Sequence, residues 1–244
     1  MNGHCLVVGG TKGIGLAVAK RMKATGDTVS IIGRGPQASD DLPGDFYAED
    51  LLKSGRGLAA ARKAVKRRGK LASLVFSQRY RGQGDAWSGE LAVSVAATRE
   101  LIEGLREDLA PGGAIVVVGS LADRFVADDS GPGYHAAKAA LRQLVRYYAV
   151  ALAPAVRVNM VLPGLVLKPE AEEFYKRNAK LHDLLKRITP LGRMARLGEI
   201  ASVIAFLCGP EASFVTGQEL VADGGLSLAF APSLARKLVR VETK

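Results

Sequence analysis

The chain has 244 residues, enough for one large α/β domain or two small ones whose core needs no disulfide or metal. Hydrophobic residues make up 48% and charged residues 24%, an ordinary globular composition that excludes a collagen-like or disordered chain. The net charge of +10 fits an anionic partner such as a phosphorylated cofactor or an acidic carrier, and because zinc-finger spacing and an aromatic-basic pattern are missing, we expect no nucleic-acid partner.

Seven short apolar or β-branched runs alternate with longer helical patterns. The run Ala114–Val118 is apolar at every position, as strands covered on both faces are. This alternation predicts an α/β fold: a doubly wound, parallel, seven-stranded Rossmann sheet with helices on both faces. The predicted strands are His4–Val8, Thr28–Ile32, Phe46–Ala48, Leu71–Phe76, Ala114–Val118, Val156–Val161 and Leu220–Val221, and the predicted helices are Gly15–Ala24, Gly57–Arg68, Ser88–Leu109, Tyr134–Leu152, Glu170–Arg187 and Gly198–Leu207.

No linker, low-complexity stretch or repeat divides the chain, so we expect a single domain over residues 1–244. Residues 1–110 are expected mainly to bind a cofactor, 111–225 to form the catalytic and substrate side, and 226–244 to be a C-terminal extension that covers the site or a neighbouring subunit. The segment 33–45, interrupted by Gly and Pro, is predicted to be a tight connection.

The sequence gives no sign of a membrane span or of secretion. The longest uncharged stretches, 109–122 and 224–235, are shorter than the roughly 20 apolar residues of a spanning helix. The N-terminus has no basic leader, and Cys5 and Cys208 are interpreted as buried core residues in a reducing compartment. We therefore expect a cytoplasmic protein.

A glycine-rich loop, residues 9–15, follows the first predicted strand and leads into a helix. Its glycines permit a tight turn and the close approach of a pyrophosphate, while the helix N-terminus supplies a positive dipole and free N–H groups. The context of strand, loop and helix predicts a dinucleotide site. The residues expected to bind the cofactor here are Gly9, Thr11, Lys12, Gly13, Ile14 and Gly15.

The end of the second predicted strand bears on the choice of cofactor. It reads Ile-Ile-Gly-Arg and holds no carboxylate where an NAD-preferring site presents one to the adenosine ribose. Arg34, with Lys12, has the charge and the donors to bind a 2′-phosphate, so we expect NADP(H) rather than NAD(H). The alternative for both residues is a solvent-facing surface cation.

Tyr134 is the one tyrosine of six with a lysine four residues later, and on a helix this spacing puts Tyr134 and Lys138 on one face. The lysine charge favours the phenolate and makes the phenol a usable proton donor to a forming alkoxide. Ser120, at the end of the fifth predicted strand, is placed to hydrogen-bond the substrate oxygen. The alternatives are a chance surface pair and, for Ser120, a turn or capping hydroxyl. The histidines show no metal-ligand spacing, so no metal is expected.

These residues, in this order and spacing, make the sequence similar to the short-chain dehydrogenase/reductase family over essentially its full length, and within it to the 3-oxoacyl carrier-protein reductase-like branch. Residues 157–164 resemble the family's sixth strand and Pro-Gly turn, and residues 214–225 its seventh strand. The resemblance implies hydride transfer between a nicotinamide cofactor and a ketone or aldehyde, with Tyr134 as proton donor and Ser120 polarising the carbonyl. Lys138 would also hold the cofactor ribose.

The resemblance also implies a homotetramer or homodimer, packed through the predicted helices Ser88–Leu109 and Tyr134–Leu152, and a small-molecule carbonyl or alcohol substrate. Further cofactor contacts are expected at Asp50, Leu51, Ser77, Pro163, Gly164 and Val166. For Asp50 an ordinary solvent-facing carboxylate is the alternative.

The chain departs from the family pattern at Val8, where the family often has Thr, and at three places that bear more directly on the site. Residues 76–79 read Phe-Ser-Gln-Arg where the family usually has Asn-Asn-Ala-Gly, which puts bulk and charge near the cofactor ribose. Ser94 stands at the family's active-site Asn, where it holds a water of the proton relay or leaves the relay rerouted. Lys168 replaces a Thr that orients nicotinamide, and it lies in the predicted lid 166–187, whose basic residues hint at an anionic or carrier-linked substrate.

Two other functions remain open at this point. The same scaffold supports dehydratases and epimerases, and the departures also suit a non-catalytic NADP-binding interaction protein. The retention of Ser120, Tyr134 and Lys138 favours the reductase, because a non-catalytic scaffold has no physical need for all three.

Overall fold

The computed structural model describes residues 3–35 and 42–239 and contains a seven-stranded, wholly parallel sheet in the order β3-β2-β1-β4-β5-β6-β9. The predicted doubly wound sheet and single domain are confirmed. Much of the predicted tight connection 33–45 lies outside the described residues. The strands are β1 (His4–Val8), β2 (Thr28–Gly33), β3 (Asp45–Ala48), β4 (Leu71–Phe76), β5 (Leu109–Val118), β6 (Val156–Pro163) and β9 (Glu219–Ala222).

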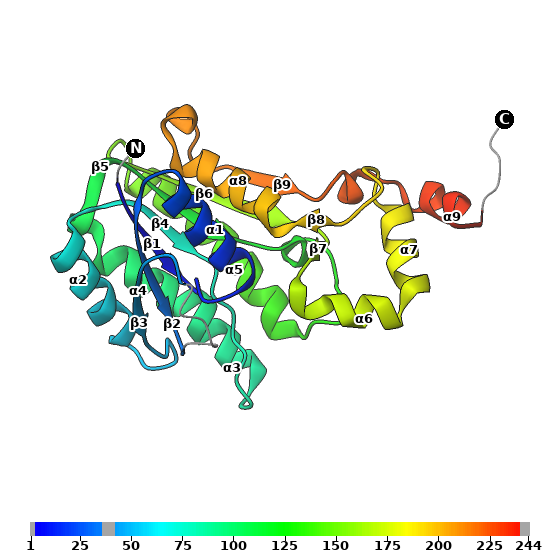
Figure 1. Cartoon of the computed structure of the whole chain (residues 1–244), viewed down its shortest axis with the longest axis horizontal. Coiled ribbons are helices and arrows are strands. Elements are labelled where there is room, and N and C mark those ends of the chain that lie inside the picture. The colour runs from blue at the N-terminus through cyan, green and yellow to red at the C-terminus, as the bar shows by residue number, and fades with distance from the viewer. Residues whose placement is uncertain (1–2, 36–41, 240–244) are drawn as a thin grey trace.

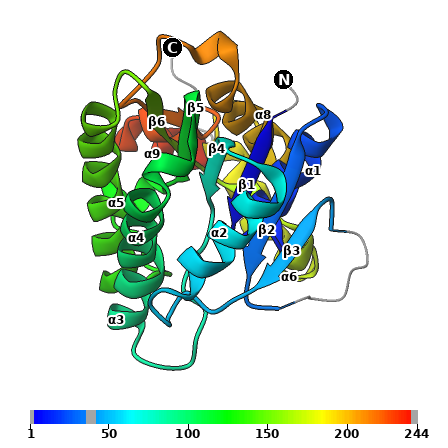
Figure 2. The same ribbon diagram turned by 90° about the vertical axis from the view of Figure 1, so that its left-hand side faces the viewer.

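Helices cover both faces of the sheet (Figures 1 and 2). Along β1, Leu6 packs in one hydrophobic cluster and Val7 in the other, since successive side chains of a strand point to opposite faces. The residues Cys5–Val8 are all fully buried. Because both faces of the strand are covered, its sequence is apolar at successive positions. The helices α2 (Arg56–Arg68), α4 (Ala97–Gly104) and α5 (Pro132–Ala151) lie on one face, and α1 (Gly13–Ala24) and α8 (Leu197–Cys208) on the other.

The prediction of one continuous helix over 88–109 is wrong. The structure has α3 (Ala86–Glu90), a π-helical turn η1 (Leu91–Ala96) and then α4, which ends at Gly104. Side chains bind the carbonyls of the wide turn: the Thr98 hydroxyl donates to the Ser94 carbonyl at 2.6 Å, and the Gln78 amide donates to the Val93 carbonyl at 3.4 Å. Such π turns widen a helix locally and are frequent at functional sites.

The helix predicted over 170–187 is also interrupted. It divides into α6 (Glu172–Arg177) and α7 (Ala179–Ile188) at Asn178, whose ψ of 51° is not helical. The Asn178 amide donates to the Phe174 carbonyl at 2.9 Å, so the side chain ends α6 by binding one of its last carbonyls.

Two segments of the C-terminal third, residues 166–196 and 226–239, form an arm on the main body, while α8 and β9 belong to that body. A two-stranded sheet that was not predicted, β7 (Val166–Leu167) with β8 (Ala195–Arg196), stands at its base. The helices α6, α7 and α9 (Ala231–Val239) extend from there (Figure 1). The guanidinium of Arg187 donates to the carbonyls of Lys237 and Leu238 at 2.7 and 2.9 Å, which ties α9 to α7.

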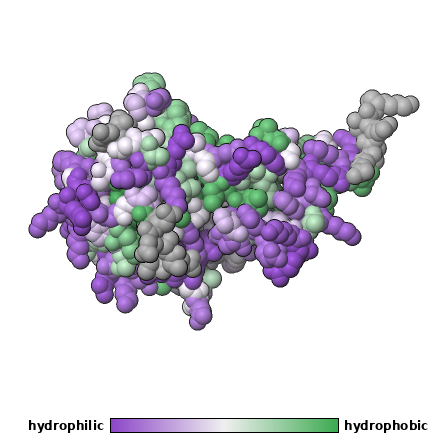
Figure 3. Space-filling model, in the orientation of Figure 1, coloured by the Kyte–Doolittle hydropathy of each residue, from purple (hydrophilic) through white to green (hydrophobic). Residues whose placement is uncertain are grey.

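On the face shown in Figure 3, hydrophilic residues predominate over the main body and hydrophobic residues gather where the arm joins it. In the part of the chain that the structure describes, no helix combines the length and the apolar character that crossing a membrane requires.

Candidate functional site

A cavity of about 860 Å³ opens beyond the carboxyl ends of the strands, where the loops after β1, β2, β4, β5 and β6 meet. Parallel α/β sheets bind their ligands at this edge. Of the predicted site residues, Gly15 and Ser94 are buried and do not line the cavity. The others line it together: Gly9, Thr11, Lys12, Gly13, Ile14, Arg34, Asp50, Leu51, Ser77, Ser120, Tyr134, Lys138, Pro163, Gly164 and Val166.

The glycine loop has the backbone that a pyrophosphate site needs. Gly9 has a φ of +80°, and a Cβ there would lie 2.6 Å from the backbone nitrogen of Gln78. Gly13 has a φ of +56° and open space where a Cβ would point. The helix α1 begins at Gly13 with no side-chain cap from Lys12, so the N–H groups of its first turn are left for a ligand. The loop therefore fits the phosphates of a dinucleotide.

Gly15→Ala is expected to destabilise the fold by about 2 kcal/mol or more, as overpacking does. A Cβ at Gly15 would lie 2.3 Å from the carbonyl oxygen of Gly9, and backbone atoms cannot move aside as a flexible side chain can. Urea unfolding measures the change. Gly35→Ala is the matched control, since no atom of residues 3–35 and 42–239 lies within 4 Å of its added Cβ. Equal stability of Gly15→Ala and wild type would contradict the close approach.

The end of the cavity next to β1 and β2 is cationic. Arg34, at the end of β2, is exposed and donates to the carbonyl of Arg81 at 3.3 Å. Lys12 is exposed beside the same cavity. The Asp50 carboxylate accepts a hydrogen bond from the Leu52 amide at 3.1 Å, so it fixes the turn after β3 and is not simply a free surface carboxylate.

The three predicted catalytic side chains line one cavity from two elements. Ser120 caps the short helix η3 (Leu121–Asp123), with its hydroxyl oxygen accepting from the Ala122 amide at 3.2 Å. The capping alternative is thus realised, and the hydroxyl hydrogen remains to be donated. Tyr134 and Lys138 lie in the first turns of α5, with the lysine Nζ 5.5 Å from the centre of the tyrosine ring.

Lys138 is buried at 4% exposure and donates to the Val118 carbonyl at 2.9 Å. Burial lowers the pKa of Lys138 to about 8; the nearby Glu90 carboxylate raises this pKa and the Arg79 guanidinium lowers it. The charge of this lysine, next to the tyrosine, therefore depends on its burial and on the neighbouring Glu90 and Arg79.

A buried carboxylate and an arginine adjoin these residues, and sequence reasoning did not single them out as a site. The Cζ atom of Arg79 lies 4.2 Å from the ring centre of Tyr134, and its Nε lies 3.3 Å from Glu90. Glu90 is only 5% exposed and accepts the Ser94 hydroxyl at 3.1 Å. A signal was present, because Glu90 stands four residues before Ser94 on a predicted helix. The catalytic role predicted for Ser94 stays a prediction, and the structure gives its hydroxyl a carboxylate partner.

Comparison with known proteins now adds to this geometry. A family model described as "Enoyl-(Acyl carrier protein) reductase" matches residues 8–227. The mouse protein "Dehydrogenase/reductase SDR family member 4" is 29% identical over 92% of this chain and 87% of its own length, and its bovine counterpart is 30% identical with the same coverage. The chain belongs to the short-chain dehydrogenase/reductase family.

Solved structures of this family agree with the fold. A short-chain dehydrogenase/reductase titled "Glucose/ribitol dehydrogenase", from Brucella melitensis, is 28% identical with a TM-score of 0.82, covering 93% of this chain and 98% of its own. The Serratia marcescens short-chain dehydrogenase/reductase is 30% identical with a TM-score of 0.78 and the same coverage. The chain is accordingly an oxidoreductase of this family, whose members use NAD(H) or NADP(H).

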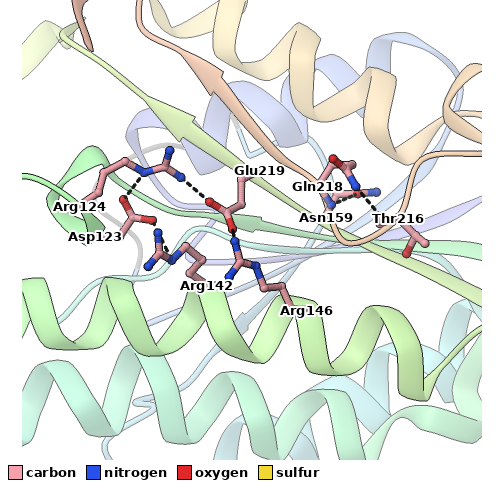
Figure 4. A network of polar contacts seen from close by, with 8 residues as sticks. All are labelled: Asp123, Arg124, Arg142, Arg146, Asn159, Thr216, Gln218 and Glu219. Carbon is pink, nitrogen blue, oxygen red and sulfur yellow. Dashed lines mark hydrogen bonds and ion pairs between the residues drawn. The ribbon is translucent and has the colours of Figure 1, made fainter. Parts of the chain in front are cut away.

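An ionic network supports the Ser120 loop of this short-chain dehydrogenase/reductase (Figure 4). Asp123, in η3, is paired with Arg124 at 3.2 Å and with Arg142 of α5 at 3.6 Å. Glu219 of β9 binds Arg146 of α5 at 2.7 Å and also contacts Arg124. The network therefore joins the segment after Ser120 to the helix that carries Tyr134 and Lys138, and it fixes their relative positions.

Among residues 3–35 and 42–239, no group of three or more His, Cys, Asp or Glu side chains is placed to hold a metal ion.

Proposed function

We propose that the protein is an NADP(H)-dependent oxidoreductase that reduces a ketone or aldehyde to an alcohol, or catalyses the reverse reaction. The observation that carries the proposal is the meeting of Ser120, Tyr134 and Lys138 with the glycine loop around one cavity. Carbonyl reduction needs a hydride donor, a proton donor and a polarising hydroxyl around one substrate carbonyl. The glycine loop would hold the cofactor that carries the hydride, and Tyr134 and Ser120 supply the other two groups.

A nicotinamide cofactor, when bound, would supply the hydride, and side chains of this chain act on the substrate oxygen. Tyr134 donates its phenolic proton to the carbonyl oxygen as negative charge develops there. The Ser120 hydroxyl donates a hydrogen bond to the same oxygen, because a carbonyl oxygen only accepts and the bond from the Ala122 amide leaves the hydroxyl hydrogen available. Lys138 holds a positive charge near the phenol and contributes to binding the ribose.

Arg34→Ala is expected to weaken NADPH binding by about tenfold or more and to change NADH binding much less. The arginine is assigned to the 2′-phosphate, and a charge-assisted hydrogen bond contributes roughly 1.5–3 kcal/mol. Fluorescence titration of the bound nicotinamide measures both affinities, with the exposed Lys66→Ala as the matched control. Equal losses for the two nucleotides would contradict the assignment.

The reaction itself is tested by following NADPH oxidation with a panel of ketones and aldehydes. Oxidation of NADPH with one equivalent of alcohol formed supports the reductase. Conversion of a hydroxy compound or a sugar without net NADPH oxidation would favour the dehydratase or epimerase, and NADPH binding without any turnover the interaction protein.

We also expect a homotetramer or homodimer. The helix α5 exposes Tyr147 at 63% and Val150 at 80%, an apolar surface suited to a second copy of the chain. Light scattering on the purified protein gives the number of chains.

A further inference from the structure

The cavity carries more positive charge than the catalytic lysine alone. Lys168 is half-buried, and its pKa is lowered first by burial and then by the charges of Arg81, Arg79 and Lys12. Glu170 opposes this effect. Like charges that share a partly desolvated space are unfavourable until an anion compensates them. Besides Lys168 and Lys138, the cavity is lined by the cations Lys12, Arg34, Arg79 and Arg81 and by the carboxylates Glu49, Asp50, Asp129 and Glu170.

The cofactor phosphates account for one part of this charge. Lys12 and Arg34 come from the loops after β1 and β2, beside the glycine loop. Arg79 comes from the loop after β4, and Lys168 follows β7. The guanidinium of Arg79 lies against the ring of Tyr134, where the carbonyl of the substrate must bind.

Arg79 is held in this position. Its Nε contacts the buried carboxylate of Glu90 at 3.3 Å, and Glu90 is held in turn by Ser94. Among the described residues, no hydrogen bond occupies the two terminal nitrogens of the guanidinium. A guanidinium fixed through Nε presents those nitrogens as a planar fork, which matches a carboxylate or a phosphate.

We propose that the carbonyl substrate carries an oxyanion group, a carboxylate or a phosphate, a few bonds from its carbonyl, and that Arg79 and Lys168 bind this group. The proposal rests on the reductase function above and specifies its substrate class. The short separation follows from the place of Arg79, whose guanidinium contacts the ring of the proton donor itself.

The test compares matched substrates that differ in charge. The arms are α-, β- and γ-oxo acids, each against its neutral amide, and dihydroxyacetone phosphate against dihydroxyacetone, so that carboxylate and phosphate are distinguished. The readout is the ratio of kcat/KM for the charged over the neutral member of each pair. A second readout needs no turnover: calorimetric binding of oxamate, a non-reducible analogue of an α-oxo acid, to the protein saturated with NADPH.

For at least one substrate pair, we expect the kcat/KM of the wild type to be about tenfold or more higher for the charged member than for the neutral one. A hydrogen bond to a charged group contributes a free energy of this size. Arg79→Gln and Lys168→Gln should each lower that ratio by about tenfold. Arg79→Lys should retain more of the preference, because it keeps the charge but not the fork. Lys66→Gln, on the exposed surface of α2, should leave the ratio as in the wild type.

Several results would overturn the inference. In one, the ratios stay near unity in the wild type. In another, oxamate and every anionic substrate bind Arg79→Gln and Lys168→Gln as they bind the wild type. If these variants weaken NADPH binding as much as they lower the ratio, the cluster serves the cofactor, and the reductase function stands without the anionic substrate. Failure of NADPH to bind at all would instead remove the proposed function, and this inference with it.

Discussion

Tyr134→Phe is expected to lower kcat by about 10²–10⁴-fold, the contribution that a positioned general acid makes. The substitution removes only the phenolic oxygen. The ring remains, with Arg79 on its face at 4.2 Å, so the wall of the cavity keeps its shape. The affinity for NADPH should fall far less than kcat, because the phosphates are held by the glycine loop and its cations.

The same helix offers a control for this change. Tyr147 lies 13 residues further along α5 and is 63% exposed, so Tyr147→Phe should leave kcat as in the wild type. Steady-state kinetics with NADPH and any reducible carbonyl measure both variants. If Tyr134→Phe turned over as fast as the wild type, Tyr134 would not be the proton donor.

Lys138→Met is expected to stabilise the ligand-free protein at pH 7 by about 2 kcal/mol while lowering turnover by about a hundredfold or more. The pKa of Lys138 falls from 10.5 to about 8 because the side chain is buried, so at pH 7 folding places an unfavourable charge in the interior. The difference between these pKa values sets an upper bound of about 3 kcal/mol. Loss of the hydrogen bond to the Val118 carbonyl offsets part of it.

The pH dependence has a definite sign. Between about pH 8 and 10.5 the unfolded chain binds more protons at Lys138 than the folded chain does, so wild-type stability rises with pH in this window. The advantage of Lys138→Met should therefore be complete below pH 8 and vanish near pH 10.5. Urea unfolding of the ligand-free proteins at both ends of the window measures it.

The exposed lysine Lys66 provides the comparison, and Lys66→Met should change stability little at either pH. A Lys138→Met protein that is less stable than wild type at pH 7 would show that the buried ammonium is fully compensated by its surroundings.

The sheet was predictable where burial dictates sequence. The bounds of β1 and β4 agree with the prediction because their residues are almost all apolar and covered on both faces. The strand β5 begins at Leu109, whereas the predicted strand begins at Ala114. The sequence between these positions contains Pro-Gly-Gly, which is typical of a loop. The pairing of Leu109 with Leu71 and that of Gly113 with Val156 show that this stretch belongs to the strand.

The helix interruptions and the arginine beside the active site depend on tertiary contacts. The spacing of Tyr134 and Lys138 is local and could be found in the sequence. Arg79 and Glu90 are eleven positions apart on different elements, and the burial of Glu90 becomes visible only when α3 packs against α5. The π turn similarly depends on Gln78 reaching across from the loop after β4.

Titration calorimetry of the purified protein with NADPH and with NADH tests the central claim most directly, because the unusual loop at residues 76–79 borders the cofactor site. We expect one NADPH to bind per chain, about tenfold or more tightly than NADH, as a charged contact to the 2′-phosphate provides. Absence of binding by both nucleotides would contradict the reductase function and mean that the bulkier loop has closed the site.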